Sequence, residues 1–179
     1  MARVTKTVSE RRQEIIDTAR ELFTEYGFDK TQISDISKSM NVAQGLVYRY
    51  FNSKTDMLYA VIDELAEEKQ MAVEEAMNNV EGSAIDRLHR LLNIKMDPTG
   101  FGNLITSIAG DAAIVEYCAN KITNSLMSAL ITLIKQGNSD GSWDCDHPEE
   151  TASFILRGFS GSLSIGGDSK ISSEKKQVL

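Results

Sequence analysis

The sequence predicts an all-α protein with an N-terminal three-helix head and a C-terminal helical bundle. Apolar residues recur at helical spacing along almost all of the 179 residues, and no segment shows the two-residue alternation of a strand with comparable quality. Hydrophobic residues make up 41% of the chain and charged residues 25%, which is typical of a globular protein. We expect two domains, a head over residues 1–53 and a body over residues 54–179.

The first helix is predicted over residues 7–26. Thr7 and Glu10 have the spacing of a capping box, and Gly27 can end the helix. The sequence therefore marks both ends of this helix locally. Its inward stripe consists of Ile15, Ile16, Ala19, Leu22, Phe23 and Tyr26.

Two short helices follow and are separated by a tight turn. Thr31 can cap the first of them, which we expect to reach about Met40, and we expect the second over residues 44–51. Asn41 lies between them, and asparagine tolerates the left-handed conformation better than most residues other than glycine. Two short helices joined in this way are typical of a helix-turn-helix.

The predicted body begins with a long helix and continues with further helical segments. Ser53 and Asp56 have capping-box spacing and open a helix that is expected to reach about Asn78. The next helix is expected to end near Asp97, because Pro98 disfavours helix before it, and a short segment follows over residues 101–109. A further helix begins at Ala112 and is expected to end at Gly137. After it we expect a polar loop over residues 138–148 and a last helix over residues 149–165.

Charge is distributed unevenly along the chain. The net charge is −7, which taken alone argues against a polyanionic partner. Residues 1–54, however, carry nine Lys and Arg against seven Asp and Glu, a balance of +2, and the remaining residues have a balance of −9. This asymmetry is expected when only the head faces a nucleic acid.

The second short helix carries the side chains that can read DNA. In a helix-turn-helix this helix lies in the major groove with its first residues toward the bases, and here those residues are Gln44 and Gly45. Glutamine can bond an adenine edge through both its donor and its acceptor. Tyr48 and Tyr50 can reach the sugar-phosphate wall or can simply pack the helix. Lys54 begins the next helix, where backbone N–H groups favour a phosphate.

These residues resemble the DNA-binding head of the TetR family of bacterial repressors. The resemblance covers about the first 60 residues. It implies an Ω-shaped homodimer, a palindromic operator, and a body whose small-molecule ligand releases the DNA. Asn41 departs from the usual glycine of the family's turn. The stretches that carry the resemblance are residues 15–23, 26–28, 33–36 and, above all, 47–58. The DNA contacts that it implies are Thr31, Gln44, Gly45, Tyr48, Tyr50 and Lys54.

The resemblance fades after about residue 65, so we interpret the body from its own pattern. An acidic helical bundle suits an internal cavity for a small hydrophobic or amphipathic effector, although an apolar stripe is more often plain core than pocket. The pattern does not name the ligand. The residues that can line such a cavity are Leu92, Met96, Phe101, Leu104, Ile108, Tyr117, Met127 and Phe154.

Two other stretches of the body contain residues that are typical of a metal site or of a dimer interface. The side chains of residues 144–147 can bind metals, but they are consecutive and lack paired spacing elsewhere, so we expect no metal site. The small residues of Gly158 to Gly161 suit a dimer interface between this helix and its symmetry mate. Only residues 172–179 remain for the further long helix of the family, which implies a truncated chain or a reduced interface.

The pattern favours a ligand-responsive repressor over two other classes. The alternative is a helix-turn-helix regulator that a protein partner controls without a small-molecule inducer. No nucleophile with a base, carboxylate pair or cofactor motif stands out, so we expect neither an enzyme nor a cofactor. The N-terminus lacks the apolar segment of a signal peptide, and no apolar run is long enough for a membrane span, which indicates the cytoplasm.

Overall fold

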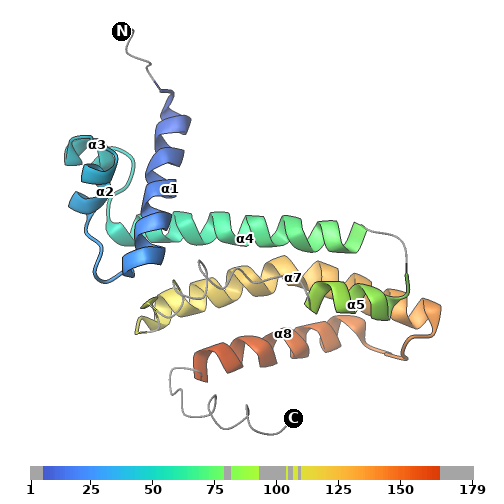
Figure 1. Ribbon diagram of the computed structural model, residues 1–179. Helices are drawn as coiled ribbons and strands as arrows, with labels where there is room; N and C mark the ends of the chain where they lie inside the picture. The colour runs from blue at the N-terminus through green and yellow to red at the C-terminus, as the bar shows by residue number, and fades with distance from the viewer. Residues whose placement is uncertain (1–5, 79–81, 93–103, 105–106, 109, 166–179) are drawn as a thin grey trace, which may run out of the picture. The chain divides into compact units, whose positions relative to one another are not determined.

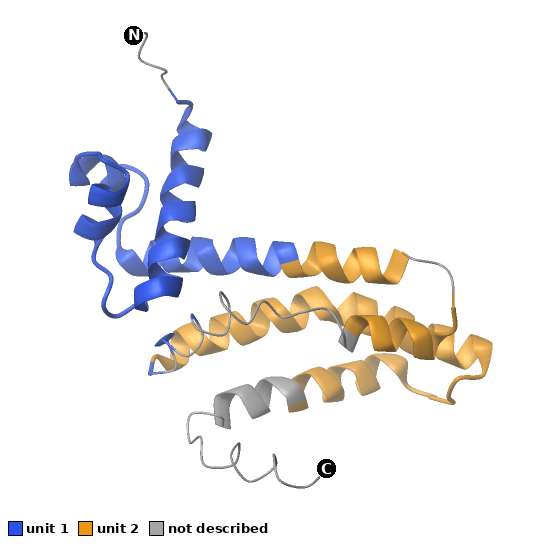
Figure 2. Ribbon diagram, viewed as in Figure 1, with its two compact units in different colours: residues 1–68, 95–110 blue, residues 69–94, 111–179 orange. Residues whose placement is uncertain are grey.

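The computed structural model describes residues 6–78, 82–92, 104, 107–108 and 110–165, except for the side chains of residues 92 and 159–165. Every regular element in these ranges is a helix, so the predicted all-α class is confirmed. The chain forms two compact units (Figure 2), which we call unit 1 (residues 1–68 and 95–110) and unit 2 (residues 69–94 and 111–179). The predicted domain boundary between residues 53 and 54 separates the expected DNA-binding head from the expected ligand-binding body. The two units are defined by contacts within the chain, so they do not test this boundary, which stays a prediction.

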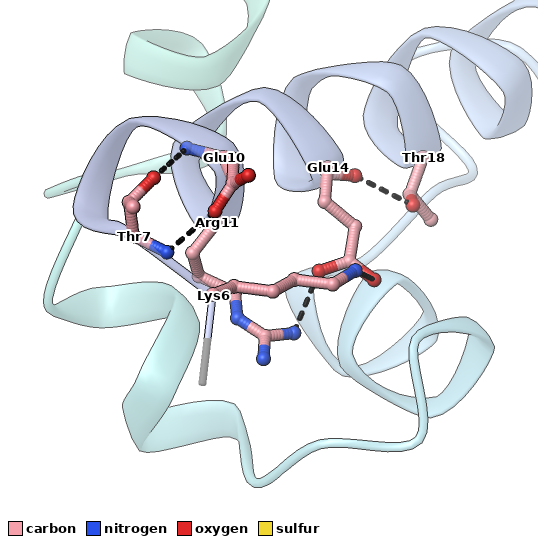
Figure 3. Close-up of polar contacts among 6 residues, drawn as sticks. All are labelled: Lys6, Thr7, Glu10, Arg11, Glu14 and Thr18. Carbon is pink, nitrogen blue, oxygen red and sulfur yellow. Dashed lines mark hydrogen bonds and ion pairs between the residues drawn. The ribbon is translucent and has the colours of Figure 1, made fainter. Parts of the chain in front are cut away.

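Unit 1 begins with α1 (Val8–Tyr26), whose start follows the predicted capping box (Figures 1 and 3). The Thr7 hydroxyl accepts a hydrogen bond from the Glu10 backbone N–H at 3.2 Å, and the Glu10 carboxylate accepts one from the Thr7 N–H at 2.7 Å. Lys6 and Arg11 both pair with Glu14, at 2.7 and 2.6 Å. The hydrogen bond from Lys6 is the largest cause that lowers the pKa of Glu14. The start of α1 is therefore fixed by polar contacts.

The helix-turn-helix consists of α2 (Ile33–Ser39) and α3 (Gln44–Tyr48). Asn41 adopts the left-handed conformation with φ of 53°, as the sequence predicts. Two details of the prediction are wrong. Residue 32, and not Thr31, is the N-cap of α2, and α3 ends at Tyr48 because residues 49 and 50 continue only as a turn.

The long helix α4 (Lys54–Asn78) begins where predicted. The Ser53 hydroxyl accepts a hydrogen bond from the Asp56 N–H at 3.0 Å, so the predicted cap is present. The first part of α4 belongs to unit 1 and is tied there to α1. The Gln13 amide donates to the Glu64 carboxylate at 2.8 Å, and a further contact joins the Arg20 guanidinium to a carboxylate of α4, residue 68, at 2.5 and 2.8 Å.

Unit 2 is built around α7 (Ala112–Asp140), which packs against α5 (Ala84–Leu92) and α8 (Pro148–Ile165). Two polar contacts reinforce this arrangement. The Ala84 N–H at the start of α5 donates to the Asp140 carboxylate at 2.7 Å, and Lys135 pairs with Glu149 at 2.6 Å between α7 and α8. A hydrogen bond from Ser142 and the one from Ala84 lower the pKa of Asp140.

The prediction that Gly137 ends the long C-terminal helix is wrong. The helix continues to Asp140, and the left-handed residue that follows it is Gly141, with φ of 78°. Gly137 instead lies inside α7 against the Trp143 indole, and a Cβ atom there would be only 1.9 Å from indole Cε2. The indole N–H donates to the Ile134 carbonyl at 2.9 Å. This glycine therefore provides space for a tryptophan six residues later.

The segment predicted over residues 101–109 is described only in part. Leu104, Ser107 and Ile108 are helical, and both apolar side chains are buried in unit 1. The other positions of this segment lie outside the described residues, as do the predicted helix end near Asp97 and residues 172–179. Among the helices that the structure describes, none combines the length and the apolar composition that a membrane crossing requires.

Candidate nucleic-acid interface

The recognition helix α3 is positioned by an apolar core on one of its faces. Val47 is fully buried, and so is Ile36 on α2, with which α3 is in contact. Phe51, which follows the turn after α3, is also buried, and the Arg12 guanidinium of α1 lies 5.0 Å from the centre of its ring. These contacts fix the rotation of α3 about its axis, so the opposite face must point to solvent.

The exposed face of α3 carries the residues that the sequence assigns to the major groove. Gln44, Gly45 and Tyr48 are all exposed, and half of the Tyr48 side chain is accessible to solvent. Gln44 and Tyr48 are four residues apart and therefore lie one above the other on the helix. Nothing lies within 4 Å of the position that a Cβ atom of Gly45 would occupy, so the backbone of α3 is open to a close approach. Tyr50 lies in the following turn and is half-buried.

Thr31 lies in a different environment from these residues. Its side chain is only 2% exposed, and its hydroxyl donates to the Gly27 carbonyl at 2.9 Å and to the Leu22 carbonyl at 3.2 Å. The hydroxyl therefore joins the end of α1 to the start of α2. The geometry gives no support to the prediction that Thr31 contacts DNA, because the side chain is packed inside unit 1.

Lys54 begins α4 as predicted, but its ammonium group has protein partners. Its Nζ atom donates to the Phe28 carbonyl at 2.7 Å and lies 3.4 Å from the Asp29 carbonyl. It also lies 4.2 Å from the centre of the Phe28 ring, a cation–π distance. The predicted phosphate contact of Lys54 stays a prediction.

Sequence reasoning missed two residues of this region. Arg49 is exposed next to Tyr48 and places a positive charge beside the face of α3. Ser107 accepts a hydrogen bond from the Phe28 N–H at 3.2 Å, and its own hydroxyl donates to the Leu104 carbonyl at 2.8 Å. The exposure of Arg49 follows from the buried position of Val47. No sequence signal indicates the Ser107 contact, because 79 residues separate its partners.

Comparison with known proteins identifies the head. Residues 15–61 match the profile described as "Bacterial regulatory proteins, tetR family", a range that contains α2, α3 and the turn between them. This match shows that the head of the chain is similar to the DNA-binding heads of TetR-family regulators. The matched range also contains Gln44, Tyr48 and Lys54.

Individual relatives are similar to this chain over a stretch of comparable length. The transcriptional regulator HbdR of Aromatoleum sp. is 42% identical over 57 residues, which are 32% of this chain and 25% of HbdR. The regulator AcrR of Shigella flexneri is 41% identical over 68 residues, 37% of this chain and 31% of AcrR. The chain thus matches only a minor part of the length of these relatives. Both relatives are transcriptional regulators of the helix-turn-helix type, the class that the sequence leads us to expect for this chain.

A solved structure extends the likeness to most of the fold. The transcriptional regulator of the TetR/AcrR family from Thermobifida fusca superimposes with a TM-score of 0.61 over 86% of this chain and 84% of that protein. The two sequences are 21% identical. This likeness shows that the body shares the helical fold of TetR-family proteins.

The described residues of the predicted pocket belong to two different units. Tyr117 and Met127 are half-buried on α7 of unit 2, whereas Leu104 and Ile108 are buried in unit 1. Phe154 is 80% exposed on α8, outside the packed core of the chain. Met96 and Phe101 lie outside the described residues, as does the side chain of Leu92. The cavity prediction therefore stays a prediction, and Phe154 calls for another explanation.

The loop between α7 and α8, which contains residues 144–147, is held by hydrogen bonds of Cys145. The Cys145 N–H and carbonyl both bond the Asn138 amide, at 2.9 and 2.7 Å, and its sulfur lies 3.2 Å from the Thr151 hydroxyl. In the described part of the chain, no three His, Cys, Asp or Glu side chains gather as metal ligands would. Burial raises the pKa of the other thiol, Cys118, to about 12.

Proposed function

We propose that this protein is a TetR-family transcriptional repressor that binds a palindromic operator as a homodimer and leaves it when a small hydrophobic or amphipathic molecule occupies the body. The exposed face of α3 is the observation that carries the proposal. Gln44 and Tyr48 lie one above the other on this face, and Gly45 between them leaves the backbone open. This arrangement suits a helix that enters the major groove and bonds base edges with its first turn.

The proposed DNA contacts are narrower than the set that the sequence implies. Gln44 and Gly45 face the bases, and Tyr48 and Tyr50 reach the sugar-phosphate wall. Thr31 is left out because its hydroxyl is bonded to two carbonyls inside unit 1. The balance of +2 over residues 1–54 supplies the mild attraction to phosphates that such a head needs.

Selection of duplexes from a random DNA library tests the proposal directly. The wild-type protein is expected to enrich a palindrome, and Tyr48→Ala is expected to lose about 10- to 100-fold in affinity for it, the scale of one hydrogen bond to a charged phosphate. Tyr26→Ala is a matched control because Tyr26 is similarly exposed, at 55%, but lies on α1. If a folded dimer enriches no sequence, the proposal that α3 binds DNA sequence-specifically is wrong.

An exposed apolar face on α8 supports the homodimer. Phe154 and Ile155 are 80% and 47% exposed, and Gly158, one turn further on, has no atom within 4 Å of its would-be Cβ. Adjacent large apolar side chains on the surface of a chain mark an interface, and a twofold axis covers such a face with its own copy. The flat surface at Gly158 lets two helices approach closely.

Sedimentation of Phe154→Glu tests the proposed dimer interface. The variant is expected to sediment as a monomer and to lose operator affinity, because one half-site cannot hold the protein alone. Ile85→Glu is the matched control, since Ile85 is also exposed, at 43%, but lies on α5. A dimer that persists in Phe154→Glu and dissociates in Ile85→Glu would place the interface elsewhere.

Release by an effector is the finer part of the proposal. We infer that a ligand in the body tilts α4, which begins at Lys54 directly after the helix-turn-helix, and so alters the separation of the two heads. Operator binding needs that separation to match the groove repeat of about 34 Å. Apo and ligand-bound crystal structures with the same head separation would refute this mechanism. A thermal-shift screen in which no compound stabilises the protein would favour control by a protein partner.

A further inference from the structure

The ammonium group of Lys54 is directed into the protein. Two of its three possible hydrogen bonds point to backbone oxygens, the Phe28 carbonyl at 2.7 Å and the Asp29 carbonyl at 3.4 Å. The Phe28 ring, whose centre lies 4.2 Å from Nζ, covers another side of the ammonium group. The lysine stem is half-buried. A side chain held in this way is already oriented before any DNA arrives.

The peptide groups that Lys54 contacts belong to the connector between α1 and α2, residues 27–32. This connector is held at several other points. The Phe28 carbonyl also accepts the Thr31 N–H at 3.3 Å, so both of its lone pairs are used, and the Phe28 N–H donates to the Ser107 hydroxyl at 3.2 Å. The Phe28 ring packs edge-on against Phe23 with centroids 5.3 Å apart. The connector is therefore fixed through both its backbone and its side chains.

The contact between Lys54 and Phe28 joins the two ends of the helix-turn-helix segment. Phe28 stands just before the helix-turn-helix, and Lys54 stands just after it. The bond between them closes a loop of residues 28–54 that contains α2, the Asn41 turn and α3. Tying the two ends of a segment together restricts how that segment can rotate or fray.

We propose that Lys54 is a positioning residue, whose ammonium joins the two ends of the helix-turn-helix segment and so presents α3 to the groove, instead of neutralising a phosphate. This inference rests on the proposed DNA binding by α3. It differs from the role that the sequence resemblance implies for Lys54, because the charge acts on two carbonyls of the chain itself. A charged donor suits this task, since bonds to ionised groups are stronger than neutral ones.

The salt dependence of DNA binding separates the two roles. A phosphate contact releases a counterion, so its removal lowers the slope of log K against log salt by about 0.9 per contact, or about 1.8 for a dimer. If Lys54 positions α3, Lys54→Met leaves the slope nearly unchanged but lowers affinity about tenfold at every salt concentration. The melting temperature is expected to fall by about 3–6 °C, and hydrogen exchange at the Phe28 and Thr31 amides to accelerate.

Lys30→Met is the matched control for this variant. Lys30 is an exposed lysine of the same connector, so its replacement removes the same charge from the same region without breaking the contacts of Phe28. Its melting temperature and its amide exchange are expected to equal those of the wild type. A melting temperature that falls equally in both variants would show that net charge, and not the Lys54 contact, is responsible.

Amine labelling of the wild-type protein tests the same inference without any substitution. A positioned Lys54 is expected to be acylated several-fold more slowly than Lys30 in the free protein, with little further change on a bound duplex. Fast labelling of Lys54 that becomes slow on DNA would overturn the inference, as would a slope reduced by about 1.8 in Lys54→Met with an unchanged melting temperature. If the wild type selects no duplex, the proposed function fails, but the labelling and exchange results still decide whether Lys54 holds the connector.

Discussion

Each of the two units of this chain has its own apolar core, and the units differ in the contacts that are added to that core. In unit 1, polar bonds between distant segments fix the backbone, as Lys54 and Ser107 do at Phe28. In unit 2, α7 packs along α5 and α8 with a close apolar contact between Gly137 and Trp143, and two polar contacts reinforce this packing. Polar bonds need particular side chains at particular spacings, whereas apolar packing accepts many combinations of similar volume.

This difference explains why the family resemblance is strongest in one region of the sequence. The family profile matches residues 15–61, where the capping, turn and connector residues lie. The body has the same fold as solved TetR-family structures at 21% identity, because a helical bundle needs only a suitable apolar pattern. Substitutions that break one kind of contact in one unit should therefore leave the other unit intact.

The largest effect on folding is expected from Gly137→Ala in unit 2. The new Cβ would overlap the Trp143 indole, which must move and weaken its bond to the Ile134 carbonyl. We expect a loss of about 2 kcal/mol in the free energy of unfolding, within the range for overpacked cores. Urea unfolding followed by fluorescence of the single tryptophan measures this loss.

A matched control distinguishes overpacking from the replacement of glycine in general. Gly110→Ala adds the same methyl group at a position with no atom within 4 Å, so its stability is expected to stay near that of the wild type. Equal stabilities of the Gly137 and Gly110 variants would show that the indole position is not fixed by the glycine.

The corresponding glycine substitution in unit 1 is expected to affect function and spare the fold. Gly45→Ala adds a methyl group to the exposed face of α3, where nothing lies within 4 Å, and alanine favours helix over glycine by up to about 1 kcal/mol. Stability is therefore expected to be equal or higher. Affinity for the selected operator is expected to fall by about 1 kcal/mol or more, the scale of one base contact, because the backbone can no longer approach the duplex.

Operator binding and thermal unfolding of the same preparation measure both effects of Gly45→Ala. Unchanged affinity with unchanged stability would mean that the first turn of α3 does not lie close to the bases. Lost affinity with lost stability would instead indicate that the methyl group disturbs the packing of α3 on α2.

Local signals in the sequence predicted the parts of the fold that depend on neighbouring residues. The Thr7 and Glu10 box, the left-handed Asn41 and the Ser53 cap each involve residues at most a few positions apart, and each is present. The order and type of the helices follow from apolar periodicity. Gly45 falls on the face of α3 opposite the buried Val47, and Gln44 and Tyr48 are exposed beside it.

The features that the sequence did not predict depend on contacts between residues whose proximity only the fold creates. Gly137 is a helix terminator by its type, but the Trp143 indole packs against it and keeps it inside α7. Threonine is a common helix cap, but the Thr31 hydroxyl donates to carbonyls at the end of α1 and therefore does not cap α2. The partners of Lys54 lie 25 and 26 residues away, so spacing gives no indication of them.

A smaller effect is expected from Ser107→Ala, which removes one bond from the connector of unit 1. The Phe28 N–H loses its acceptor, and we expect a loss of about 1 kcal/mol in the free energy of unfolding, the typical value for one buried hydrogen bond. Ser125→Ala is the matched control in unit 2, because the Ser125 hydroxyl donates to the Ile122 carbonyl of its own helix and so joins no distant segments. Hydrogen exchange at the Phe28 amide should accelerate in the first variant and not in the second.

The smallest effect is expected from two carboxylates of unit 1 and has opposite signs at the two sites. Burial is the largest cause that raises the pKa of Glu64 above its ordinary value of 4.5, whereas the bond from Lys6 lowers that of Glu14. A raised pKa means that the folded state binds the proton more tightly, so ionised Glu64 weakens the fold at neutral pH. Ionised Glu14 strengthens the fold, and this contribution is lost as the pH falls through its lowered pKa.

Thermal unfolding across the pH range measures these opposite signs. At pH 7, Glu64→Gln is expected to melt up to about 2 °C above the wild type, and Glu14→Gln a similar amount below it, since partly exposed charges have small effects. The gain in Glu64→Gln should disappear as the pH falls through the raised pKa toward 4.5, because the wild-type carboxyl is then neutral as well. A gain that persists at low pH would mean that the amide improves packing, and that the charge of Glu64 does not oppose the contact between α1 and α4.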